Sequence, residues 1–254
     1  MILGLEFPPL SHIVDWPGLV GEGEWWEINK VVLIYGFAVM FTFLLFILGN
    51  KKQMVPTGAQ NLAEVSIEFI EEQIVLPTIG AGGEKWTPYL TSLFFFIFFT
   101  NIFEVIPIFQ MPANARIALP MFLALLTFVL YNGAGIREHG FFGYLKHSLM
   151  PPGVPALLYI VVIPIELVSN FFIRPFSHMV RLFANLLAGH ILLVTFAILT
   201  ATLWTTEWYA AFLPLPLFGV IAFTAFEILV SFLQAYVFTL LAGVYIDLCT
   251  SHEH

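Results

Sequence analysis

Arg181 is the residue of this sequence whose presence is hardest to explain by folding alone. It opens the run RLFAN at residues 181–185, inside a long apolar segment. A guanidinium at the centre of a bilayer costs roughly 2.5–3.5 kcal/mol, and it does not lose its proton to escape that cost. An arginine so placed therefore predicts a functional site.

Polar side chains lie on both sides of Arg181 within apolar segments. One group is predicted toward one membrane face and comprises Glu104, His190, Glu227 and Gln234. The other group is predicted toward the opposite face and comprises Glu166, Ser169, Asn170, Arg174, Ser177 and His178. At 100° per residue Arg181 and Asn185 share a helical face, whereas His190 points the opposite way. A histidine beside a carboxylate such as Glu227 is suited to pass protons, because imidazole titrates near neutral pH.

Two polar groups separated by a fixed positive charge predict an ion path in two halves. A continuous polar path would leak protons, whereas two offset half-paths blocked by a guanidinium would not. An ion then crosses only if a moving carrier takes it from one half-path to the other. No residue of this chain resembles that carrier, so the sequence predicts a partner that bears it.

The composition places these residues in a membrane protein. The chain has 254 residues, of which 59% are hydrophobic and 10% charged, against about 25% charged in soluble domains. The net charge of −8 lies mostly in tails and loops and argues against nucleic acid as a partner. A lone Cys249 excludes an internal disulfide and a cysteine-based metal cage. We expect neither a metal site nor a cofactor.

The hydrophobic pattern predicts an all-α integral membrane protein. Three segments have the length of ordinary spans, namely residues 31–49, 88–109 and 115–136. Alternating glutamates and apolar residues predict an amphipathic surface helix at 60–76. A polar segment rich in glycine and proline predicts a loop at 137–155.

Two further apolar segments, at about 156–204 and 208–247, are too long for simple spans of about 20 residues. They predict a hairpin of two long, tilted helices, in which Pro164 and Pro175 produce kinks without ending the helix. The expected organisation is an N-terminal extracytoplasmic segment at 1–29 and a single membrane domain at 30–254.

Basic residues predict the orientation. Lys51, Lys52, Arg137 and Lys146 mark cytoplasmic loops by the positive-inside rule. The N-terminus is then outside and the C-terminus cytoplasmic, so that the half-path with His190 opens outward.

The motifs around these residues resemble one known family. They are the segments 174–177, 181–185 and 188–189, the residue Glu227 followed by 234–238, and Thr100-Asn101-x-x-Glu104-x-x-Pro107. From about residue 30 to its C-terminus the chain resembles subunit a of the F-type ATP synthase, in a bacterial-like form. The resemblance implies a proton-translocating stator subunit beside a rotating ring of c subunits, each with one carboxylate. It further implies b-type peripheral stalk subunits and the rest of the complex as partners, and a bacterial plasma membrane. The acidic N-terminus favours a bacterial over a mitochondrial origin.

The resemblance also assigns roles by position. Arg181 matches the essential stator arginine. The outer half-channel is matched by Asn185, His190, Glu227, Gln234 and Glu104, and the inner one by Glu166, Ser169 and Ser177. The chain departs from the usual pattern in having Ala184 where glycine is common. His190 and Glu227 are exchanged relative to many bacterial members, as in mitochondrial ones, and the spacing from Glu166 to Pro175 is one residue longer than usual.

Other functions fit the sequence less well. A proton-coupled secondary transporter is the main alternative, but it usually shows paired repeats with broken helices. A cytochrome needs axial ligands on facing helices, whereas His178 and His190 share one helix. The sequence has no phosphate-binding loop and no nucleophile elbow, so we expect no ATP chemistry in this chain.

Structural roles also remain open for single residues. Arg181 could be a hydrogen-bond hub, Asn185 and Gln234 could bridge helices, Glu104 could cap a helix, and Glu166 could pair with Arg174.

Overall fold

The computed structural model describes residue 18 and residues 20–21, 28–49, 58–106, 113–150, 153–205 and 207–251. In this part of the chain the regular secondary structure is helical, apart from an isolated antiparallel bridge between Val20 and Ile28. The expected N-terminal segment 1–29 lies almost wholly outside the described residues. The predicted all-α class is confirmed.

Four described helical segments are long and apolar enough to cross a membrane by length and composition. They are Lys30–Ile47, Ala118–His139, Ala156–Leu203 and Trp208–Thr250. The last two contain 48 and 43 residues, so the prediction of two very long helices is confirmed. Many large apolar side chains on these helices are exposed, which suits a surface that faces lipid.

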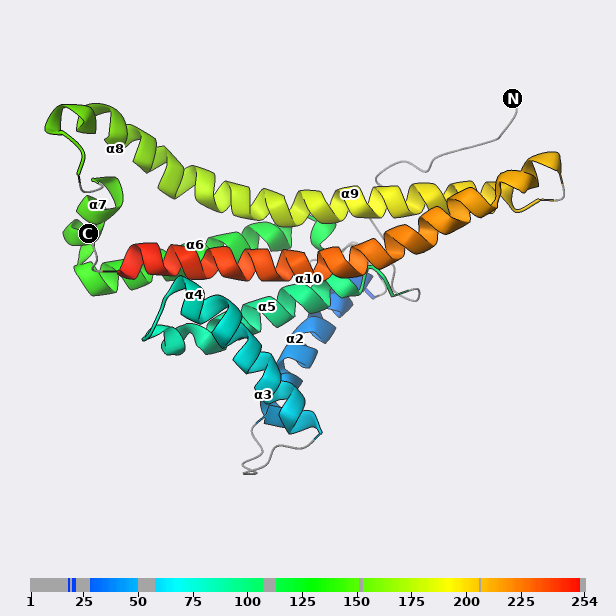
Figure 1. The fold of residues 1–254 in the computed structure, drawn as a ribbon, viewed down its shortest axis with the longest axis horizontal. Helices are drawn as coiled ribbons and strands as arrows, with labels where there is room; N and C mark the ends of the chain where they lie inside the picture. The colour runs from blue at the N-terminus through cyan, green and yellow to red at the C-terminus, as the bar shows by residue number, and fades with distance from the viewer. Residues whose placement is uncertain are drawn as a thin grey trace. The chain divides into compact units, whose positions relative to one another are not determined.

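The first long segment is one helix in several parts (Figure 1). It begins with the short turn η4 (Ala156–Leu158) and continues as α8 (Tyr159–Val168), the π-helix η5 (Ser169–Ile173) and α9 (Arg174–Leu203). The second long segment consists of η6 (Trp208–Phe212) and α10 (Pro214–Thr250).

Each of the two π-helices lies just before a proline. In the amphipathic segment, α3 (Ala59–Ile70) runs into the π-helix η1 (Glu71–Val75) and then α4 (Leu76–Thr78). Pro77 lies two residues after η1, as Pro175 lies two residues after η5. A proline ring clashes with the carbonyl one turn earlier and leaves it without a donor. A wider π-turn accommodates that clash. The long helix then continues through Pro175 to Leu203, whereas the amphipathic helix ends at Thr78, directly after Pro77.

Helix α5 (Thr87–Ile102) is shorter than the predicted span 88–109. Tight turns follow it, in which the N–H of Glu104 donates to the carbonyl of Asn101 and that of Val105 to Ile102, both at 3.1 Å. Pro107 follows in the sequence, and a proline disfavours helical backbone at the residue before it. Glu104 therefore lies just after the end of a helix.

The predicted loop at 137–155 is wrong over most of its length. Helix α6 (Ala118–His139) continues to His139 and helix α7 (Phe141–Leu149) follows after Gly140. Gly140 has φ of 71°, a conformation that glycine adopts without strain and that separates the two helices. Tyr144 of α7 donates a 2.6 Å hydrogen bond to Asn132 of α6. Tertiary packing thus stabilises a nine-residue helix that would be marginal alone.

The described chain divides into two compact units. Unit 1 contains residues 1–43, 95–116 and 183–235, and unit 2 contains residues 44–94, 117–182 and 236–254. The chain passes from unit 2 into unit 1 within α9, and back within α10. Each unit therefore contains a part of both long helices.

Aromatic contacts hold each unit together. In unit 1, Phe196 of α9 stacks on Phe223 of α10 at 5.0 Å between ring centroids. In unit 2, Tyr131 of α6 lies 5.5 Å from Tyr245 of α10. Aromatic pairs thus join α9 to α10 in unit 1 and α6 to α10 in unit 2. Such pairs stabilise packing by more than their buried area alone.

Candidate functional site

A group of buried titratable side chains lies inside unit 1. His190 of α9 approaches Glu104, with Nδ1 3.2 Å from the carboxylate Oε1. The carboxylate of Glu227 on α10 lies beside Gly189, the residue before His190. All three side chains are buried: His190 is 7% exposed, Glu104 3% and Glu227 4%. We call Glu104, His190 and Glu227 the buried carboxylate cluster.

Glu104 is thus the carboxylate within ion-pair distance of His190. Sequence reasoning paired His190 with Glu227 and placed Glu104 on the same half-path. The structure joins His190 to a third element, the turn after α5, and so connects three segments far apart in the sequence. A buried carboxylate and a histidine at this distance can exchange a proton directly.

Gly189 explains how Glu227 reaches the cluster. A Cβ at position 189 would lie 2.6 Å from Cδ and 2.8 Å from Oε2 of the Glu227 carboxylate. Real Cβ atoms do not approach so closely, so the absence of a side chain leaves the space that the carboxylate fills. Gly189 belongs to one of the family motifs, but its position in the sequence predicts no role for it. The only available signal was a glycine beside a buried histidine.

A hydrogen-bonded network supports the turn that carries Glu104. The side-chain amide of Asn114 donates to Thr100 Oγ1 at 2.9 Å and to Asn101 Oδ1 at 2.6 Å. All three residues are fully buried. Asn114 therefore fixes the end of α5, one turn before Glu104. Sequence reasoning did not single out Asn114, because its contact partners are more than twelve residues away.

Gln234 is also buried in unit 1, seven residues beyond Glu227 on α10. Its side-chain nitrogen has no hydrogen-bond partner in the part of the chain that the structure describes. A buried donor without a partner is costly, so this amide needs a water or another molecule. Asn185 is half-buried.

Arg181 differs from the cluster because it is exposed. Ala184, Ala188 and Leu192 are exposed too, and they follow Arg181 at steps of three and four residues. These four residues therefore form one stripe along α9, which we call the arginine stripe. Among the described residues, Arg181 has no ion-pair partner.

His178 lies three residues before Arg181, inside unit 2, and is only 3% exposed. Its ring centroid is 3.7 Å from that of Phe238 and 5.8 Å from that of Tyr245, both on α10. Neither ring nitrogen has a hydrogen-bond partner in the described chain. The sequence places this histidine in the inner polar group, whereas in the structure its ring packs against aromatic rings.

The predicted inner residues are more open than the outer ones. Glu166 and Ser169 are half-buried and Ser177 is exposed. Arg174 places its guanidinium 5.5 Å from the ring centroid of Tyr245, a cation–π arrangement. The structure therefore gives Arg174 an aromatic partner on α10.

Asn170, which the sequence places in the inner polar group, makes a contact with another helix that the sequence did not predict. It lies in the π-helix η5 and donates to the backbone carbonyl of Ser148 in α7 at 2.8 Å. The missed helix α7 thus holds the π-helical segment in place. No group of three or more metal-binding side chains occurs within the described ranges.

Known proteins similar to this chain share one description. The family model described as ATP synthase A chain matches residues 31–247. An ATP synthase subunit a of Rhodococcus erythropolis is 40% identical over 233 residues, which cover 90% of this chain and 85% of that protein.

Two further relatives agree in description and extent. An ATP synthase subunit a of a Nocardioides species is 36% identical over 261 residues, covering 97% of this chain and 94% of the relative. One of Rhodopseudomonas palustris is 38% identical over 233 residues, covering 91% and 90%. The similarity therefore extends over nearly the whole length of this chain and of each of these two relatives.

Proposed function

Because the chain belongs to the ATP synthase subunit a family, we propose that Arg181 separates two proton half-channels and faces the carboxylates of a rotating c-ring. The subunit is non-catalytic and belongs to the proton-conducting membrane sector of the complex, and it is a multi-pass membrane protein. Family membership sets aside the alternative of a separate secondary transporter.

One observation carries the proposal: Arg181 is exposed and without an ion-pair partner in the described chain. A permanent cation on a membrane helix is costly unless a negative group approaches it. The small side chains of Ala184 and Ala188 on the same stripe allow another helix to come close. A helix of the c-ring with its carboxylate satisfies both requirements.

The guanidinium has two effects on a proton carrier. Its positive charge favours the ionised form of an approaching ring carboxylate, which forces that carboxylate to release its proton. The same charge repels a proton that would pass directly between the half-channels. Proton flow is then possible only through rotation of the ring.

The outer half-channel runs through the buried carboxylate cluster. His190 and Glu104 are close enough to exchange a proton, and the Glu227 carboxylate lies beside Gly189, next to His190 in the sequence. Gln234 and Asn185 continue this path toward Arg181. The inner half-channel runs along Glu166, Ser169 and Ser177. The N-terminus lies outside and the C-terminus in the cytoplasm.

Disulfide cross-linking tests the arginine stripe. Ala188→Cys in a Cys249→Ser background is expected to cross-link to a cysteine placed beside the carboxylate of the c subunit. Leu186→Cys, two residues away but buried, is the matched control and is expected to stay unlinked. Equal cross-linking at both positions in the assembled complex, or none at either, contradicts the proposed ring-facing side.

Thiol labelling tests the direction of the two half-channels. In the same background, Glu227→Cys is expected to react with a membrane-impermeant reagent from outside, and Glu166→Cys from inside. Labelling of both positions from the same face refutes the two-half-channel geometry, even if the cross-link to the ring forms.

A further inference from the structure

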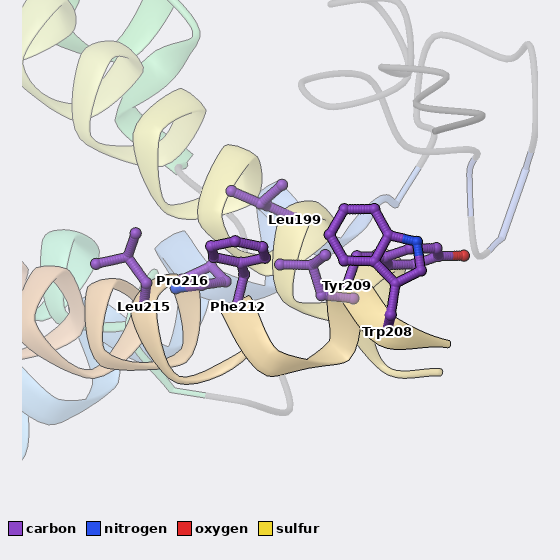
Figure 2. A pocket seen from close by; sticks show the side chains of 7 residues that line it. Leu199, Trp208, Tyr209, Phe212, Leu215 and Pro216 are labelled. Carbon is purple, nitrogen blue, oxygen red and sulfur yellow. The ribbon is translucent and has the colours of Figure 1, made fainter. Parts of the chain in front are cut away.

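A hollow lies near the loop that joins the two long helices, away from the proton path. It belongs to unit 1 and has a volume of about 310 Å³, within the range of small-molecule sites. It is lined by Leu199 and Leu203 of α9, Trp208, Tyr209 and Phe212 of η6, and the start of α10 at Leu215. Figure 2 shows Leu199 on one helix opposite the ring of Phe212 on the other segment.

The rings beside this hollow indicate its depth in a membrane. Trp204 and Trp208 are 74% and 75% exposed, and the loop between them carries Glu207, which is also exposed. Tryptophan and tyrosine concentrate where bilayer and water meet. The hollow therefore opens at the level of lipid headgroups and upper acyl chains, where an apolar lining is in contact with lipid.

The charged residue near this hollow indicates which kind of lipid headgroup would be attracted to it. Between His190 and Glu227 the sequence contains one charged residue, Glu207. It lies at the start of η6, next to Trp208, and the N–H of Ala210 donates to its backbone carbonyl at 3.0 Å. A carboxylate in the headgroup layer attracts an ammonium group and repels an anionic headgroup.

We propose that this hollow binds an acyl chain of an amine-bearing phospholipid, whose headgroup pairs with Glu207. The apolar lining receives the chain, the exposed tryptophans flank the glycerol region, and the carboxylate selects the headgroup. The site is separate from the proton path and does not depend on the roles of the residues around Arg181.

Lipid retention in native mass spectrometry tests the site. The purified complex is reconstituted with equal amounts of dioleoyl phosphatidylethanolamine and dioleoyl phosphatidylglycerol and then extracted in detergent. Leu199→Trp fills the hollow and is expected to lose the retained phosphatidylethanolamine. Leu217→Trp, on α10 but outside the lining, is the matched control and is expected to keep it.

Glu207→Gln tests the headgroup without disturbing an interior. Its side chain is exposed, so folding is not at stake, and the preference for phosphatidylethanolamine over phosphatidylglycerol is expected to fall by about fivefold. Equal retention in the wild type, Leu199→Trp and Leu217→Trp means annular lipid only and overturns the site. An unchanged preference in Glu207→Gln overturns the proposed headgroup.

Discussion

Two buried histidines on α9 have opposite surroundings. His190 lies in unit 1 with a carboxylate oxygen of Glu104 at 3.2 Å. His178 lies in unit 2 against the ring of Phe238, and both its nitrogens are without a hydrogen-bond partner in the described chain. The residues are twelve positions apart, about 120° around the helix, so they face different neighbours.

This difference separates a proton-transfer position from a packing position. A histidine beside a carboxylate can take up a proton and pass it on. A histidine enclosed by aromatic rings has no group to exchange with, and its protonated form would be buried without a partner. In the sequence of α9, Arg181 lies between these two histidines. Burial of a histidine in a membrane helix therefore says little about its role until its contacts are known.

Removing the charge between the two histidines should have the largest effect. Arg181→Ala is expected to lower ATP-driven proton pumping in membrane vesicles by about 10²–10³-fold, as for other groups that stabilise a developing charge. Arg181→Lys is expected to rescue poorly, because lysine lacks the planar fork and can lose its proton when buried. Near-normal coupled pumping in Arg181→Ala would contradict the proposal that Arg181 separates the two half-channels.

Arg174→Ala is the control for that experiment. It removes the same charge from the same helix, but its guanidinium lies over the Tyr245 ring. Pumping is expected to persist, with a loss of stability of about 0.5–1 kcal/mol from the cation–π contact.

Breaking the pair at His190 should have the next largest effect. His190→Ala leaves Glu104 buried without its partner, so we expect pumping to fall by about 10²-fold and the complex to melt at a lower temperature. The exchange of His190→Glu with Glu227→His keeps the same groups in the cluster and is expected to recover more flux than either single change. If the double variant pumps no better than the worse single, His190 and Glu227 do not act together, and the path runs through Glu104.

Gly189→Ala tests the cluster without removing a titratable group. The added Cβ displaces the Glu227 carboxylate, and pumping is expected to fall by about tenfold, the effect of a modest misplacement of a reacting group. Gly219→Ala is a matched control, since its Cβ would meet the Phe196 ring at 2.5 Å and no titratable group. It should lower the melting temperature and leave pumping coupled. Equal pumping losses in both variants would attribute the Gly189 effect to packing alone.

The fold was predictable from the sequence where hydrophobic length decides it. The two long segments exceed a simple span, and both occur as very long helices in the structure. The π-helices and α7 were not predictable in this way. A π-turn before Pro175 depends on local backbone adjustment, and α7 depends on the contact of Tyr144 with α6, which no pattern of hydrophobic residues encodes.

The candidate site was predictable in its residues but not in its contacts. Charged and amide side chains in apolar segments are costly, so Glu104, His190 and Glu227 stand out in the sequence. The contact of His190 with Glu104 requires α5 to end at Ile102 and its following turn to reach α9. The role of Gly189 follows only once the Glu227 carboxylate is placed beside it.

Asn114 gives a smaller test of how the His190 side is held. Asn114→Ala removes hydrogen bonds to Thr100 and Asn101, so we expect a loss of stability of about 1–3 kcal/mol and a partial loss of pumping. Asn132→Ala in unit 2 loses the contact with Tyr144 and is the control. It should lower stability without changing the pumping rate of folded complexes. A pumping loss in Asn132→Ala equal to that in Asn114→Ala would contradict a specific role for the turn.

The smallest effect is expected at His178. His178→Leu places an apolar side chain of moderate size against Phe238 and removes two ring nitrogens that have no hydrogen-bond partner in the described chain. Replacing such a group by an apolar one is neutral or stabilising, so coupled pumping should stay near the wild-type rate and the melting temperature should not fall. His178→Asn keeps a buried polar group in the same place and is expected to lower the melting temperature. The decisive comparison is with His190→Leu, the same substitution at the other buried histidine of α9, which should block pumping. A block of equal size in His178→Leu would place His178 on the proton path and remove the distinction between the two histidines.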